Sequence, residues 1–82
     1  MSKISIDLHE SFNKGTKIDE LLNSAIREAV GNKIDLVEII HGKGSGQLKK
    51  RVLRFLQQPH IKQLYKRVEK DSKNFGRLFV RF

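Results

Sequence analysis

Two short segments of the sequence carry residue types that can move protons and bind phosphate. The first is Asp7-Leu8-His9, in which a carboxylate and an imidazole lie two residues apart. The second is His41, which is followed at once by Gly42-Lys43-Gly44-Ser45-Gly46. Histidine accepts or releases a proton near neutral pH, and a carboxylate can orient it or bind a divalent cation. Asp7, His9 and His41 are therefore candidate catalytic residues.

The glycine segment 42–46 is the candidate phosphate-binding element. Three glycines in five residues permit positive φ angles and close approach of a phosphate. A helix that follows would add unpaired amides and a partial positive charge. Lys43 offers a cation, and Ser45 offers a hydroxyl donor or a helix cap. A tight strand-to-helix turn that binds no ligand has the same composition. Segment 42–46 can therefore be either a phosphate-binding loop or such a turn.

The segment does not match the known nucleotide-cofactor motifs. It lacks the Gly-Lys-Ser/Thr ending of a P-loop, and Gln47 stands where the pattern Gly-x-Gly-x-x-Gly requires its last glycine. We therefore expect no nucleotide cofactor.

The excess positive charge is confined to the second half of the chain. Residues 1–40 hold five Lys and Arg against seven Asp and Glu, a charge of −2, whereas residues 41–82 hold twelve against two, a charge of +10. This asymmetry favours a nucleic-acid partner over a basic surface kept for solubility. A membrane surface is disfavoured, because the basic half lacks a long amphipathic helix with large exposed apolar residues. The expected contacts are Lys49, Lys50, Arg51 and Arg54, with Lys62, Lys66 and Arg67 beyond them.

Hydrophobic periodicity predicts the element order β-α-β-α-β-β. The apolar run 34–40 suits a strand covered on both faces. Gly31-Asn32 is expected to end the first helix in a left-handed conformation, and Pro59 is expected to stop the second. The predicted elements are a strand at 3–8, a helix from Thr16 to Gly31, a strand at 34–40, a helix from Gln47, a strand around 61–68, a turn at 71–76 and a strand at 78–82.

These elements predict a two-layer α/β sandwich with a mixed four-stranded sheet, forming one domain over residues 1–82. Parallel pairing of strands 3–8 and 34–40 would bring Asp7, His9 and His41 to one edge, where open parallel sheets bind their ligands. The chain has no cysteine and no apolar run of membrane-spanning length. We therefore expect no disulfide, no signal peptide and no membrane span, and a cytoplasmic location.

The two chemical segments resemble the motifs of a known family, the Smr (small MutS-related) domains. Ile6-Asp7-Leu8-His9 resembles the family's Leu-Asp-x-His motif, and His41 with segment 42–46 resembles its His-Gly-x-Gly-Ser/Thr-Gly motif. Leu48 and Arg51-Val52 fit the helix that follows the second motif. Gly76 to Val80 resembles the family's glycine turn and closing strand, although only one glycine remains there. The resemblance covers nearly the whole chain.

The resemblance implies a fold similar to the C-terminal domain of bacterial translation initiation factor three. It also implies nucleic-acid binding, with nicking of DNA or RNA in several members. The matching positions are Asp7 and His9, then His41, Gly42 and Gly44. Glu10 stands where the family often has glycine. Two alternatives stay open for it: joining Asp7 in binding Mg²⁺ or Mn²⁺, or repelling phosphate.

Two functions follow as hypotheses. One is a nicking endonuclease acting on branched DNA or structured RNA. The other is a non-catalytic DNA- or RNA-binding module, repair- or ribosome-associated. Either could form part of a larger protein.

Overall fold

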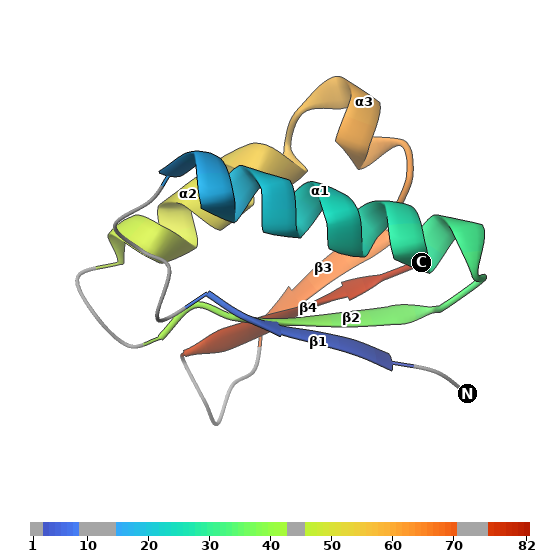
Figure 1. Ribbon diagram of the computed structural model, residues 1–82, viewed down its shortest axis with the longest axis horizontal. Helices are drawn as coiled ribbons and strands as arrows, with labels where there is room; N and C mark the ends of the chain where they lie inside the picture. The colour runs from blue at the N-terminus through green and yellow to red at the C-terminus, as the bar shows by residue number, and fades with distance from the viewer. Residues whose placement is uncertain (1–2, 9–14, 43–45, 71–75) are drawn as a thin grey trace.

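A mixed four-stranded sheet carries three helices on one of its faces (Figure 1). The computed structural model describes residues 3–8, 15–42, 46–70 and 76–82. The sheet order is β1-β2-β4-β3, with β1 parallel to β2 and both other pairs antiparallel. The predicted two-layer architecture is confirmed. The elements are β1 (Lys3–Asp7), α1 (Gly15–Gly31), β2 (Leu36–Ile40), α2 (Gln47–Leu56), α3 (Pro59–Lys62), β3 (Arg67–Lys70) and β4 (Arg77–Arg81).

Helix α1 packs one apolar stripe against the sheet. Apolar side chains recur along it at spacings of one, three and four residues, which places them on one face of an α-helix. Val30 lies near the end of the helix and is 47% exposed. The buried members are Ile18, Leu22, Ala25, Ile26 and Ala29.

The end of α1 differs from the expectation. The helix includes Gly31, and the left-handed residue is Lys33, with φ 56°. The Ile34 amide donates to the Ala29 carbonyl at 2.8 Å, a six-to-one bond that closes the helix in a Schellman motif. The prediction of a left-handed Gly31-Asn32 stop was therefore wrong by one to two residues. A Schellman motif places its left-handed residue just after the last helical turn. Because α1 continues through Gly31, that position falls on Lys33 and not on the glycine.

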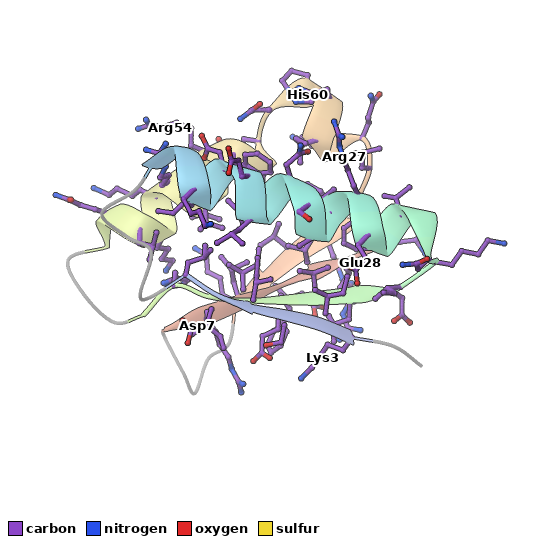
Figure 2. All side chains as sticks on the ribbon, viewed as in Figure 1. Lys3, Asp7, Arg27, Glu28, Arg54 and His60 are labelled. Carbon is purple, nitrogen blue, oxygen red and sulfur yellow. The ribbon has the colours of Figure 1, made fainter. Side chains whose placement is uncertain are left out.

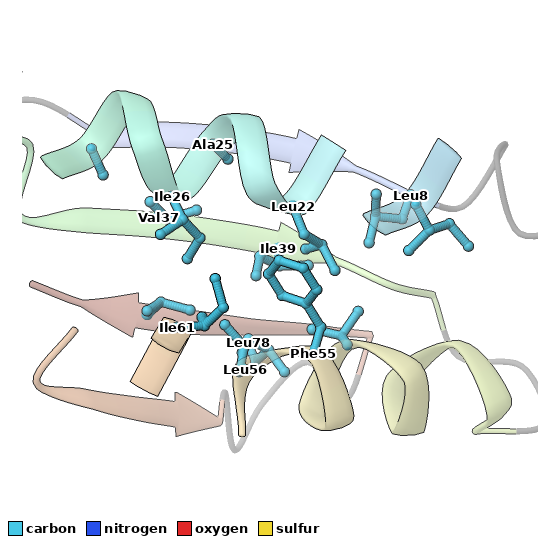
Figure 3. Close-up of a cluster of buried hydrophobic side chains, with 14 residues drawn as sticks. Leu8, Leu22, Ala25, Ile26, Val37, Ile39, Phe55, Leu56, Ile61 and Leu78 are labelled. Carbon is cyan, nitrogen blue, oxygen red and sulfur yellow. The ribbon is translucent and has the colours of Figure 1, made fainter. Parts of the chain in front are cut away.

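Strand β2 is interior to the sheet but is covered by helices on one face only. Val37 and Ile39 are fully buried and face the helices, together with Leu78 and Val80 of β4 (Figure 3). The expected coverage of β2 on both faces is confirmed, by helices on one face and by neighbouring side chains on the other. Glu38 is 5% exposed although it lies on the helix-free face, because neighbouring side chains cover it.

The segment after α2 also departs from the expected strand. Helix α2 ends at Leu56, before Pro59, and Pro59 begins the short helix α3, where its missing amide hydrogen costs nothing. Ile61 is buried from this helix, so its predicted place in a strand was wrong. The Tyr65 hydroxyl donates to the Leu56 carbonyl at 2.6 Å and ties the connection to α2. Strands β3 and β4 pair antiparallel.

In the described part of the chain, no helix combines the length and apolar character that a bilayer crossing requires.

Candidate nucleic-acid interface

The carboxyl ends of β1 and β2 lie side by side at one edge of the sheet. Asp7 pairs with Ile40 in parallel register, and the Leu8 amide extends the pairing by donating to the Ile40 carbonyl at 2.9 Å. The predicted parallel neighbourhood of the two strands is therefore confirmed. His9 and Glu10 lie outside the described residues.

His41 and Gly42 are fixed at this edge by the residue that precedes β4. The amides of His41 and Gly42 both donate to the Gly76 carbonyl, at 2.8 and 2.9 Å. Accepting two successive amides turns the chain sharply after β2, and Gly42 takes a φ of 84°, which favours glycine. The second motif thus begins with a turn that Gly76, distant in the sequence, holds in place.

The His41 ring is buried, with one nitrogen paired and one unpaired. The side chain is 5% exposed, and its Nδ1 lies 2.9 Å from the Gly42 carbonyl oxygen. Because a carbonyl oxygen only accepts, Nδ1 must carry the hydrogen, which leaves a lone pair on Nε2. Nε2 is buried and has no hydrogen-bond partner within the described residues.

Three effects act on the pKa of His41. Burial of the ring lowers the pKa below its ordinary value of 6.5 and outweighs the opposing hydrogen bond to Gly42. The nearby positive charge of Lys49 lowers the pKa further. His41 is therefore a neutral imidazole at neutral pH, and Nε2 can accept a proton or a hydrogen bond.

Asp7 reaches the same edge from the opposite face of the sheet. Side chains alternate along a strand, so the exposed residues Lys3, Ser5 and Asp7 point away from the helices (Figure 2). His41 follows Val37 and Ile39 in the row that faces the helices. The structure thus brings Asp7 and His41 to one edge but not to one face.

Within the described residues, no three His, Cys, Asp or Glu side chains gather closely enough to hold a metal ion. Asp7 is the one proposed ligand that the structure describes, so the donor set expected with Glu10 is not complete there.

Helix α2 presents its basic residues outward. Val52, Phe55 and Leu56 are buried in the core, which turns the opposite face to solvent. The residues on that face are Lys50, Arg51 and Arg54, all exposed, while Lys49 is half-buried on the side near His41 (Figure 2 shows Arg54).

The amino end of α2 has no side-chain cap. Gly46 is the N-cap residue, with φ 87°, and no acidic residue lies in the first turn. A Cβ at Gly46 would meet nothing within 4 Å, so only its backbone angle calls for glycine. The first amides of the helix and its partial positive charge can therefore face an anion. Lys43, Gly44 and Ser45 lie outside the described residues.

Comparison with known proteins identifies the family. The model of the Smr domain matches residues 6–82. The chain belongs to the Smr domain family. This confirms the resemblance noted in its two motifs, and the family is known for nucleic-acid binding and nicking.

A solved structure supports the fold of this Smr domain. The crystal structure of the Smr domain of Thermus thermophilus MutS2 matches it with a TM-score of 0.73 at 14% sequence identity, over 99% of this chain and 96% of that one. At this identity the match shows the fold alone. No curated protein sequence gives a significant match.

Sequence reasoning missed Glu38, which organises the helix-free face of this Smr domain. Its carboxylate accepts hydrogen bonds from Ser5 Oγ at 3.0 Å and from Arg77 at 2.7 Å, and Lys3 Nζ lies 3.4 Å away. The Arg77 guanidinium also stacks over Phe79, 5.3 Å from the ring centre. The sequence offered one indication of this role, because Glu38 is the single acidic residue within the apolar strand Leu36–Ile40.

The other predicted basic contacts lie away from the edge that carries His41. Arg67 pairs with Arg81 in the sheet register, at the opposite end of β4 from Arg77. Lys66 and Arg67 border a shallow pocket there, together with Asp35 and Arg81. These cations therefore lie at the end of the sheet opposite the His41 edge, and Lys62 is the last residue of α3.

Proposed function

We propose that this Smr domain binds DNA or structured RNA along α2 and nicks the strand that it holds. The observation that carries the proposal is the buried His41 ring, neutral and with a lone pair on Nε2, beside a helix whose outer face is basic. A neutral histidine is suited to general-base catalysis, and the buried Nε2, which has no hydrogen-bond partner among the described residues, would act once the attacking water reaches it.

Binding would rest on Lys50, Arg51 and Arg54 and on the amino end of α2. Cations that neutralise phosphates release condensed counterions, so this surface predicts salt-dependent affinity without sequence preference. The segment Gly42–Gly46, including Lys43 and Ser45, would hold the phosphate nearest the sheet edge. Lys49, whose charge acts on His41, would serve both binding and catalysis.

The proposed reaction is hydrolysis of one phosphodiester bond. His41 Nε2 takes a proton from a water molecule, whose oxygen bonds to phosphorus while the bond from phosphorus to the leaving sugar oxygen breaks. His9 is the candidate that gives the leaving oxygen its proton. Lys49 and the backbone amides at the start of α2 would stabilise the charge on the phosphoryl oxygens. Asp7 would orient His9 from the helix-free face.

A divalent cation is a further hypothesis for this site. Asp7 would hold it with Glu10, and bound Mg²⁺ or Mn²⁺ would supply charge stabilisation at the phosphate. The described residues offer only Asp7 for this role, so the proposed steps depend on the protein's own side chains.

A second candidate function is a non-catalytic DNA- or RNA-binding module. The observation in its favour is that Asp7 and His41 approach the edge from opposite faces of the sheet. Binding through α2 does not require these two side chains to meet.

A cleavage assay distinguishes the two functions. Supercoiled plasmid and a structured RNA are incubated with the protein and Mg²⁺, Mn²⁺ or EDTA, beside the Asp7→Asn and His41→Ala variants, whose folding is checked by circular dichroism. Arg27→Gln, on the outer face of α1, is the control (Figure 2). Nicking that both site variants lose and the control keeps supports the enzyme. Intact substrate with salt-sensitive binding supports the binding module, and absence of binding contradicts both.

The binding surface has its own test. On duplex DNA the slope of log affinity against log salt is about −0.9 per neutralised phosphate. Lys50→Gln and Arg54→Gln should each reduce that slope by roughly one phosphate contact. Arg27→Gln removes the same charge from α1 and should leave the slope unchanged. Equal effects of all three variants would show that overall charge, not α2, governs binding.

A further inference from the structure

One cation on the outer face of α2 already has a carboxylate partner. Arg51 Nη2 lies 3.3 Å from Asp19 Oδ2, which belongs to the first turns of α1. The pair joins the two helices across the surface, with side chains 42% and 48% exposed. A negative charge therefore touches the face that is proposed to receive phosphates.

The geometry of this pair is weak compared with what Arg51 can make. Arginine binds carboxylates and phosphates best through two parallel bonds of about 2.7–2.9 Å. Asp19 contacts the guanidinium through one oxygen at a longer distance. Exposed pairs of this kind contribute little to stability, so a better anion can replace the carboxylate at small cost.

The surroundings of Arg51 favour such a replacement. Lys50 and Arg54 are exposed on the same face of α2, and the first turn of α2 contains no acidic residue. A backbone phosphate at Arg51 would be attracted by all three positive charges. Asp19, which is fixed on α1, contacts only Arg51 among them.

We propose that Asp19 occupies the phosphate position at Arg51 in the free domain and that a nucleic-acid backbone phosphate displaces it. This inference rests on the proposed nucleic-acid binding by α2. It makes Asp19 an intramolecular competitor that sets the affinity of the surface. The ligand class is a phosphodiester, which can accept both bonds of the guanidinium.

The test compares two substitutions of equal charge. Asp19→Asn removes the competitor, and Glu20→Gln removes the neighbouring exposed carboxylate of the same helix. Affinity for a fluorescein-labelled duplex and for a stem–loop RNA is measured by anisotropy at low salt. We expect Asp19→Asn to bind roughly two- to fivefold more tightly, the range that loss of an exposed pair allows. Glu20→Gln should show a smaller gain, from general charge alone.

A double-mutant cycle assigns the gain to Arg51. In the Arg51→Gln background, Asp19→Asn should improve affinity no more than Glu20→Gln does. Equal gains from both substitutions, a gain that persists without Arg51, or no gain at all would each overturn the inference while wild-type binding stands. Absence of salt-sensitive binding by the wild type would instead remove the proposed function, and this inference with it.

Discussion

Replacing Glu38 by glutamine tests how the helix-free face of the sheet is held together. The variant keeps the shape of the side chain and removes its charge. The carboxylate is 5% exposed and receives the Arg77 guanidinium at 2.7 Å, the Ser5 hydroxyl at 3.0 Å and the Lys3 ammonium at 3.4 Å. We expect a clear loss of stability at neutral pH.

The magnitude follows from the partners of the carboxylate. A hydrogen bond to a charged group contributes about 1.5–3 kcal/mol, but Arg77 is 37% exposed, so solvent screens part of that. Lys3 is 51% exposed and adds at most about 1 kcal/mol. Since glutamine keeps one acceptor oxygen, the expected loss is about 2 kcal/mol. This is a large share of the roughly 4–12 kcal/mol typical of a domain of this size.

The pH dependence of this loss has a definite sign. Burial of the Glu38 carboxyl raises its pKa, but the hydrogen bonds from Arg77, Ser5 and Lys3 outweigh burial and hold the pKa below its ordinary value of 4.5. The ionised group therefore stabilises the fold fully above pH 4.5, and this contribution disappears as pH falls through the lowered pKa. Glutamine does not titrate, so the difference between wild type and variant should vanish in acid.

Urea unfolding followed by circular dichroism measures both effects. At a slope of about 1 kcal/mol per molar urea, the neutral-pH midpoint should fall by roughly 2 M. Glu20→Gln, an exposed carboxylate with the same chemical change, is the control and should leave the midpoint nearly unchanged. Equal midpoints for wild type and Glu38→Gln at pH 7, or a difference that persists below the titration of Glu38, would refute the reasoning.

Three further outcomes are expected. The pKa of His41, measured by NMR of the imidazole, should lie below 6.5 because burial disfavours the charged ring. The fold should therefore lose stability as pH falls from 6.5 through that lowered pKa. A measured pKa above 6.5 would contradict the buried, neutral ring. Leu22→Ala should cost about 2–5 kcal/mol in urea unfolding, whereas the 38% exposed Leu64→Ala should change stability by about 0.5 kcal/mol or less; similar costs would contradict the core assignment. Lys33→Gly should stabilise the domain by about 0.5–1 kcal/mol in thermal unfolding, because glycine relieves the left-handed backbone at φ 56°; a destabilised variant would mean that the lysine side chain contributes there.

Local sequence signals predicted the elements that depend on local physics. The apolar stripe of α1 and the inward residues Val52, Phe55 and Leu56 of α2 needed only helical periodicity. The end of α1 was missed because glycine is merely the commonest left-handed residue, and here the turn formed at Lys33. Ile61 was misplaced because a short apolar run suits a strand as well as a single helical turn, and Pro59 decided for the helix.

The site was predicted to the level of the sheet edge and no further. Which face a side chain takes depends on the register between strands, and pairing Asp7 with Ile40 puts Asp7 on the face opposite His41. That register is set by pairing between two segments far apart in the sequence, so neither segment alone reveals it. The double acceptance by the Gly76 carbonyl is likewise a tertiary contact between residues far apart in the chain.

The place of β4 in the sheet has a consequence for folding of the domain. This strand follows all the others in the sequence, yet it lies between β2 and β3. Until it docks, β2 keeps one side of its backbone unpaired beside the apolar Val37 and Ile39, and such edges recruit strands from other molecules. The five residues Arg77–Arg81 therefore protect the domain from self-association as well as completing its sheet, and a chain shortened to Lys70 should be recovered as aggregate.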